Sequence, residues 1–159
     1  MDHDKQLREQ LAKTIDWNEA HTDFSGVVSG FPAKLRGRVP EGFPHSGWQL
    51  LEHIRIALWD MVEFSQDAKH KSPKWPEGYW PKDPEPPNDD VWEKSVKAVE
   101  ENLEAMRKLI RDPKQDLFAA IPHGSGQTLL REALLIADHN AYHLGQLVLV
   151  RRALGAWKG

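Results

Sequence analysis

Two histidines, His139 and His143, stand four residues apart in the stretch ADHNAYHLGQ. Residues four apart on an α-helix lie on one face a single turn from each other, so the two imidazoles can bind one metal ion. With eight histidines in 159 residues, the spacing alone is also consistent with solvated imidazoles on a helix surface. The pattern around the pair has to distinguish these two interpretations.

The apolar residues around the pair indicate which side of the helix carries the imidazoles. Leucine, alanine and valine recur with helical spacing between residues 130 and 148 and cover an arc of roughly 120°. His143 falls just outside one edge of this arc, and His139 lies roughly 40° further round the same edge. Both side chains are therefore expected at the border of the core.

A third histidine has an equivalent position in an upstream helical pattern. In LLEHIRIALWDM, His53 lies just outside the apolar stripe that includes Leu50 and Ile54. If the two helices pack together, the three neutral imidazoles suit zinc, nickel, copper or ferrous iron. Three protein ligands leave a coordination position open, as in catalytic rather than structural sites. Taken alone, His53 is equally consistent with a boundary histidine satisfied by hydrogen bonds.

The remaining histidines are weaker candidates for metal ligands, and the residue after His139 argues against one known class of metal site. Histidines 3, 21, 45, 70 and 123 lie at the N-terminus or in unpatterned segments and are poorer candidates. The spacing H-x-x-x-H also occurs in zincin proteases, where a glutamate after the first histidine acts as general base. Here that position is Asn140, which cannot take a proton, so a zincin protease is excluded.

Three further polar residues are candidates to orient the imidazoles. Gln146 and Glu132 lie on the same flank as His139 and His143, and Asp60 follows His53 on its helix. Each can accept an imidazole N–H and set the tautomer of the ring. Each is also consistent with a solvated polar rim. Asn140 points nearer the core and is expected to be a buried polar group.

Four long stretches without proline predict the helices that position these residues, over about 5–29, 46–66, 89–111 and 127–154. The second has the clearest start, because Ser46 followed by Gln49 forms a capping box. Apolar residues in the last three recur with the spacing of helices that pack in a bundle. The fold class is therefore all-α, a four-helix bundle with long proline-rich connections, in a single domain over residues 1–159.

The longest connection, residues 71–90, contains six of the eleven prolines and is expected to be irregular chain. Connections of this length in a compact domain are usually functional or disordered. Its aromatic residues Trp75, Tyr79 and Trp80 favour packing over disorder. We expect the segment to lie across the bundle, with Trp75 or Trp80 largely buried near the mouth of the site.

Composition limits the classes of function and partner. The formal net charge is −3 without a concentrated basic patch, which disfavours nucleic acids and membrane surfaces as partners. The absence of cysteine excludes disulfides, thiolate ligands and a cysteine nucleophile. No stretch is apolar enough to span a bilayer, and the charged N-terminus is unlike a signal peptide, so we expect a cytoplasmic location. Trp59, Leu135 and Leu149 lie outside the main stripes and are candidates for a homodimer face.

The segments HSGWQLLEHIRIALWDMVEFS and LLREALLIADHNAYHLGQLVLVRRALG together resemble the DinB-like superfamily, the DinB/YfiT-type proteins. The likeness covers the whole chain in helix order and linker placement. Its specific part is the histidine of the first segment combined with HNAYHLGQ in the second. It implies a four-helix bundle, often dimeric, that binds a divalent metal, commonly zinc or nickel, through His53, His139 and His143.

The resemblance also implies a class of reaction. Characterised members include S-transferases and isomerases that use bacillithiol, mycothiol or glutathione, so a metal-dependent S-transferase acting on a small molecule with a low-molecular-weight thiol is expected. A bound metal holds such a thiol as the nucleophilic thiolate, and the protein needs no cysteine of its own. Two alternatives stay open: a metal-dependent hydrolase, and a non-enzymatic, stress-associated metal-binding protein.

Overall fold

The helix that carries His53 begins where the capping box predicts. In the computed structural model, which describes residues 2–157, α3 covers Gly47–Gln66. The Ser46 hydroxyl accepts a hydrogen bond from the backbone N–H of Gln49, and the Gln49 side-chain oxygen accepts one from the backbone N–H of Ser46. Both N–H groups lack partners within the helix, so the box fixes its first turn.

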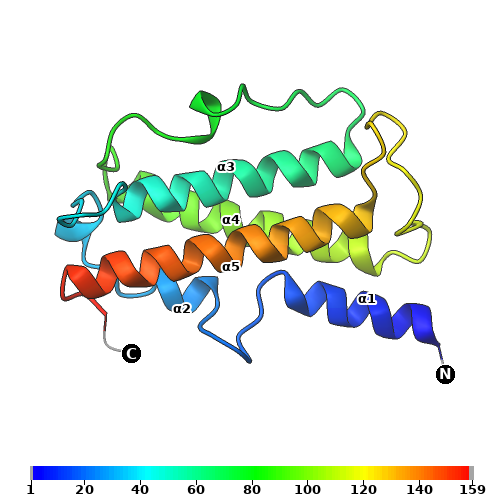
Figure 1. The fold of residues 1–159 in the computed structure, drawn as a ribbon, viewed down its shortest axis with the longest axis horizontal. Coiled ribbons are helices and arrows are strands. Elements are labelled where there is room, and N and C mark those ends of the chain that lie inside the picture. Colours follow the sequence, from blue (N-terminus) through cyan, green and yellow to red (C-terminus); the bar gives the residue numbers. More distant parts are fainter. Residues whose placement is uncertain (1, 158–159) are drawn as a thin grey trace.

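The two other long helices also follow the sequence pattern. α4 covers Asp89–Arg111 and α5 covers Leu129–Ala153, with side-chain caps at Asn88 and Thr128. Their apolar faces pack with α3 around a shared core. Fully buried members of this core are Ile54, Leu58, Leu103, Met106, Ile136 and Leu147. This packing places α3 beside α5 along their length (Figure 1).

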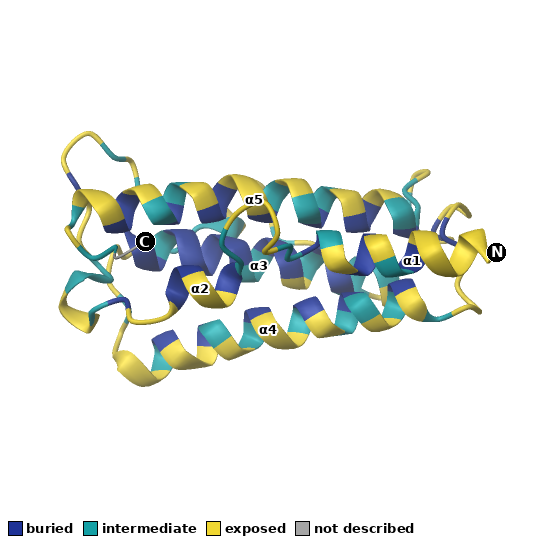
Figure 2. Ribbon diagram, turned by 90° about the horizontal axis from the view of Figure 1, so that it is seen from below, coloured by how far each residue is buried: buried dark blue, intermediate teal, exposed yellow. Residues whose placement is uncertain are grey.

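The prediction of one helix over residues 5–29 is wrong. The structure has two helices there, α1 over His3–Thr14 and α2 over Phe24–Val28, with irregular chain between them. They follow each other along the bundle and bury one side each (Figures 1 and 2). The result is an all-α bundle in which α1 and α2 together take the place of one long helix.

Side-chain hydrogen bonds account for the break between α1 and α2. The Asp23 carboxylate caps α2 by accepting from the backbone N–H of Gly26, and the Asp16 carboxylate accepts from the backbone N–H of Phe24. Aspartate side chains that bond to nearby backbone in this way compete with helical hydrogen bonds. No residue between Ile15 and Phe24 is buried, so packing does not favour a continuous helix.

The connection between α3 and α4 lies along α3 on the outside of the bundle (Figure 1). It includes a short 3₁₀ helix, η2, over Glu77–Tyr79, which contacts α3. A second 3₁₀ helix, η1, covers Ala33–Leu35 before α3. Within residues 2–157, no helix combines the length and the apolar character needed to cross a bilayer.

Candidate metal centre

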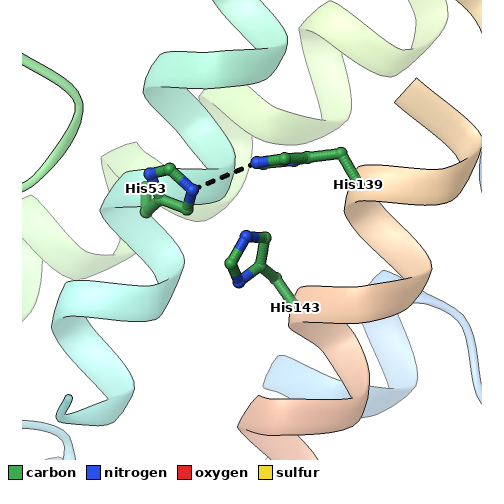
Figure 3. Close-up of side chains that lie close together, drawn as sticks. All are labelled: His53, His139 and His143. Atoms are coloured by element: carbon green, nitrogen blue, oxygen red, sulfur yellow. Dashed lines mark hydrogen bonds between the residues drawn. The ribbon is translucent and has the colours of Figure 1, made fainter. Parts of the chain in front are cut away.

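The three predicted histidines lie together between α3 and α5. His53 projects from α3, and His139 and His143 project from successive turns of α5 toward it (Figure 3). Each offers one ring nitrogen, and these nitrogens all lie within 4.8 Å of one another. Figure 3 also shows the contact between His53 Nε2 and His139 Nε2, which are 3.1 Å apart.

The spacing of these nitrogens fits a metal ion. Two nitrogens bound to zinc at about 2.1 Å, with an angle of about 90–110° between them, lie about 3.0–3.4 Å apart. The separation of 3.1 Å between the Nε2 atoms of His53 and His139 falls in this range. His53 and His139 can therefore share a divalent ion at their present separation, and a ring nitrogen of His143 lies within 4.8 Å of both.

The protein orients two of the three rings through their second nitrogen. His53 Nδ1 lies 3.0 Å from the carbonyl oxygen of Tyr79, and His143 Nδ1 lies 2.7 Å from Oε1 of Gln146. An Nδ1–H that donates to such an oxygen leaves Nε2 without a proton, in the form that binds metal. His139 Nδ1 is buried and has no hydrogen-bond partner among the described residues.

Burial keeps the imidazoles neutral. Desolvation is the main cause that lowers the pKa of His53 and of His139, in each case to about 4, and it also lowers the pKa of His143. Repulsion between neighbouring imidazolium charges acts in the same direction on His53 and His139, while the hydrogen bonds to Tyr79 and Gln146 oppose it. Since protons and metal compete for the same nitrogens, neutral rings favour metal binding.

An aromatic side chain from the proline-rich connection covers one side of the triad. The Trp80 ring stacks on the His53 ring, with centroids 3.8 Å apart and planes within 5°, and it also stacks on His45 at 4.1 Å. Of the two tryptophans named in the prediction, Trp80 lies at the site and packs against the core, with only part of its surface exposed, whereas Trp75 is 68% exposed. The linker position of His45 gave no sign in the sequence that its ring would lie here.

Asp60 does not contact the triad, but it contacts residues of the connection that bonds to His53. Its carboxylate accepts hydrogen bonds from the Tyr79 hydroxyl at 2.6 Å and from His70 Nε2 at 2.7 Å. Burial raises the pKa of Tyr79, so its hydroxyl stays protonated and continues to donate. Because Asp60 follows His53 by seven residues, about 10 Å along a helix, it reaches the connection that bonds to His53 and not His53 itself.

The predictions for the polar residues of α5 have mixed outcomes. Gln146 contacts a triad imidazole, as described above. Glu132 is 2% exposed but pairs with Arg131 at 2.7 Å, and seven residues separate it from His139, again about 10 Å along the helix. Asn140 is buried as predicted, and its Oδ1 has no hydrogen-bond partner within residues 2–157.

Comparison with known proteins gives the family. A family model described as the DinB superfamily matches residues 16–147, most of the chain and all three histidines. The chain belongs to the DinB superfamily. This agrees with the resemblance inferred from the two histidine-bearing segments. No curated protein and no solved structure matches this DinB superfamily member.

Proposed function

We propose that this DinB superfamily protein binds one zinc or nickel ion through His53, His139 and His143 and transfers a low-molecular-weight thiol to a small-molecule acceptor. The observation that carries the proposal is the convergence of three neutral imidazoles, two of them oriented through Nδ1. Zinc and nickel are both well suited to imidazole ligands.

The composition of the site supports thiol chemistry. A divalent ion bound there would lower the pKa of a small-molecule thiol, so that the thiol reacts as its thiolate at neutral pH. The chain has no cysteine, so the nucleophilic sulfur would have to come from such a molecule. Within the described residues, no fourth histidine, aspartate or glutamate belongs to the group, which supports an open position.

Metal content tests the site directly. The wild-type protein should bind one equivalent of zinc or nickel, and His53→Ala, His139→Ala and His143→Ala should each weaken binding at least about 100-fold, because two ligands remain. The exposed His21 is a matched control outside the triad, and His21→Ala should bind normally. The comparison of His53→Ala with His139→Ala is decisive, because α3 and α5 supply these ligands separately. If His53→Ala kept its metal, the three-histidine site would be wrong.

A conjugation assay tests the reaction. The metal-loaded protein is mixed with glutathione, bacillithiol or mycothiol and an electrophilic aryl halide, and thioether formation is measured with His53→Ala as control. Conjugation that requires both metal and His53 supports the proposal. Hydrolysis of an ester without thiol would favour a metal-dependent hydrolase instead. Stoichiometric metal without either reaction would favour a non-enzymatic metal-binding protein.

A further inference from the structure

A cavity of about 190 Å³ lies next to the triad, and metal binding alone does not account for it. Its wall is mostly apolar. The apolar lining includes Phe43, Leu50, Leu149 and Val150, and the polar lining residues are His45 and Gln146. Within residues 2–157, no aspartate, glutamate, lysine or arginine lines it, so these residues offer no ionic partner to a charged group placed there.

Contacts on both sides connect the cavity to the triad. Gln146 lines the cavity and is hydrogen-bonded to His143. His45 lines it from the other side and stacks on Trp80, which itself stacks on His53. Leu50 precedes His53 by three residues on α3, and Gln146 follows His143 by three on α5. The cavity therefore begins about one helical turn, or about 5 Å, from the imidazoles.

We propose that this cavity receives an alkyl or aryl group of about six carbons, carried by the small molecule that reacts at the triad. The inference rests on the proposed function. An engineered apolar protein cavity of about 150 Å³ holds benzene, so the volume here suits a group of this size. The deepest lining residues, Leu50 and Val150, are 2% and 1% exposed. An apolar group that contacts these side chains is transferred from water to an apolar surface, and this transfer has a favourable free energy.

A series of alkanethiols tests the inference. The protein is loaded with cobalt(II), and its visible absorption is titrated with ethanethiol, butanethiol and hexanethiol. If the thiol carries the apolar group, each buried methylene should tighten binding up to about fourfold, so hexanethiol should bind about 10–100-fold more tightly than ethanethiol. The gain should reach a plateau once the chain fills the cavity.

Two leucines of α5 provide a matched pair of variants. Leu149 lines the cavity and Leu134 does not, and both side chains are 52% exposed. Leu149→Trp should fill the cavity and remove most of the preference for hexanethiol. Leu134→Trp should leave the preference unchanged. Because both positions are on the surface, neither change is expected to prevent folding.

The apolar group can belong to the thiol or to its acceptor, and 1-hexanol distinguishes these sources. Binding of hexanol to the cobalt protein is measured by calorimetry with saturating ethanethiol and again with saturating hexanethiol. If the thiol carries the group, hexanethiol should displace hexanol. If the acceptor carries it, hexanol should bind beside either thiol. In both cases Leu149→Trp should abolish hexanol binding, and either result supports the cavity.

The inference and the proposed function fail in different ways. Equal affinity for the three thiols, together with no binding of hexanol, would overturn the inference and leave the thiol chemistry intact. A cobalt spectrum that no thiol changes would overturn the proposed function. Binding of hexanol that both leucine variants weaken equally would also overturn the inference, because the cavity beside Leu149 would then not be the site.

Discussion

One ring nitrogen of each of two triad histidines forms a hydrogen bond within the protein. His53 Nδ1 bonds to the Tyr79 carbonyl, and His143 Nδ1 bonds to the Gln146 side chain. This arrangement leaves Nε2 of each ring for a ligand and fixes its direction. The rings are also largely removed from water, which lowers the pKa of each triad histidine. The folded, metal-free protein therefore favours the neutral form of these imidazoles more than the unfolded chain does.

The stability of the metal-free protein should fall as the pH drops from about 6.5 toward 4. An unfolded histidine has a pKa of about 6.5, whereas the folded pKa of His53 and of His139 is about 4. Between these values the unfolded chain binds more protons than the folded one, so acid favours unfolding, by at most about 1.4 kcal/mol per unit of pKa difference for each group. Urea unfolding in the presence of a chelator, repeated across this pH range, measures the slope.

A glutamine variant isolates the contribution of the triad from that of the carboxylates. His139→Gln should unfold with a shallower pH dependence than wild type, because one buried titrating group is removed. His21→Gln changes an exposed histidine and should match the wild-type slope. Equal slopes in wild type and His139→Gln would contradict the prediction.

At the scale of elements, the proline-rich connection links α3 to the triad. Asp60 on α3 holds the connection through the hydroxyl of Tyr79 and through His70. The backbone carbonyl of Tyr79 then holds His53, and the next residue, Trp80, stacks on it. One short segment thus transmits the position of α3 to a ligand ring, and the Asp60 carboxylate is its attachment nearest Tyr79, while Ser46 and Gln49 at the start of α3 donate to carbonyls further along the connection.

Removing the hydroxyl of Tyr79 should loosen this attachment. Tyr79→Phe removes one of the hydrogen-bond donors to the half-buried Asp60 carboxylate, which should lower the free energy of unfolding by on the order of 1–3 kcal/mol. Zinc affinity should fall about tenfold, because a residue that orients a ligand is weakened. Proteolytic cleavage within residues 71–88 should become faster.

The only other tyrosine gives a matched control. Tyr142 is 63% exposed, and Tyr142→Phe removes the same hydroxyl from a position where no strong effect is expected. Zinc affinity and cleavage rate should match those of wild type. If Tyr79→Phe were as resistant to cleavage and bound zinc as tightly as Tyr142→Phe, the attachment through Asp60 would be unimportant.

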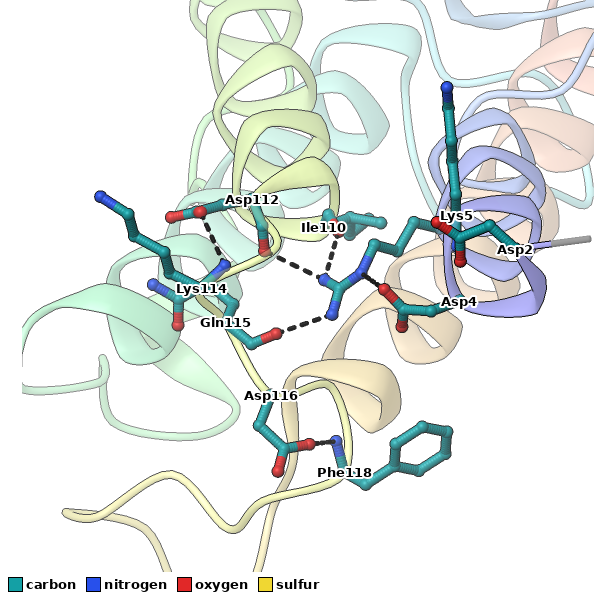
Figure 4. A network of polar contacts seen from close by, with 10 residues as sticks. Asp2, Asp4, Lys5, Ile110, Asp112, Lys114, Gln115, Asp116 and Phe118 are labelled. Atoms are coloured by element: carbon teal, nitrogen blue, oxygen red, sulfur yellow. Dashed lines mark hydrogen bonds and ion pairs between the residues drawn. The ribbon is translucent and has the colours of Figure 1, made fainter.

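At the scale of the whole molecule, two buried arginines join the N-terminal helices to the ends of the long ones. Arg8 of α1 donates to the backbone carbonyls of Ile110, Asp112 and Gln115 at 2.8–3.1 Å, at the end of α4 (Figure 4). Arg151 of α5 donates in the same way to carbonyls at the end of α2. Carbonyls at helix ends have no partner within the helix, so these side chains satisfy them and hold the short helices in place.

Replacing Arg8 should destabilise the fold far more than replacing an exposed arginine between the same helices. Arg8→Met leaves several carbonyls without donors and should lower the free energy of unfolding by about 1–3 kcal/mol. Arg111 also links α4 to α1, through Glu9, but both side chains are more than 40% exposed, so Arg111→Met should cost less than about 1 kcal/mol. Urea denaturation compares the two. Equal losses would mean that burial of Arg8 adds nothing.

The proposed homodimer is the other prediction at this scale. Two of its candidate residues have intramolecular contacts, Trp59 with His70 and Leu135 with the core, whereas Leu149 is 52% exposed. Leu149 shares one exposed face of α5 with Tyr142 and Gly145, where open space surrounds the glycine. Exposed apolar surface of this kind favours association, so we expect a dimer in solution.

Light scattering measures the molar mass that this prediction requires. Wild type should be dimeric. Leu149→Glu should be monomeric, because dimerisation would bury the new carboxylate at the contact. Leu134→Glu changes a leucine that is equally exposed in the wild type and should remain dimeric. A wild-type monomer at high protein concentration would reject the dimer.

The sequence alone determined the features that depend on neighbouring residues. The capping box set the start of α3, and apolar periodicity set α4 and α5, because both act over a few turns. The same periodicity placed His139, His143 and Gln146 on one flank, and the spacing of residues on a helix made their proximity predictable. His53 required one further step, the packing of α3 against α5.

Only the tertiary structure decided the features that depend on where the irregular segments pack. The break between α1 and α2, the Tyr79 carbonyl behind His53, and the stacking of Trp80 with His45 all involve chain without a repeating pattern. Asp60 illustrates the reason. Helix phase correctly placed its carboxylate on the same side of α3 as His53. Its partners Tyr79 and His70, however, lie on an irregular connection, and no repeating pattern in the sequence predicts the path of that connection. Contacts made by backbone carbonyls and loops are set by packing between residues that are far apart in the sequence.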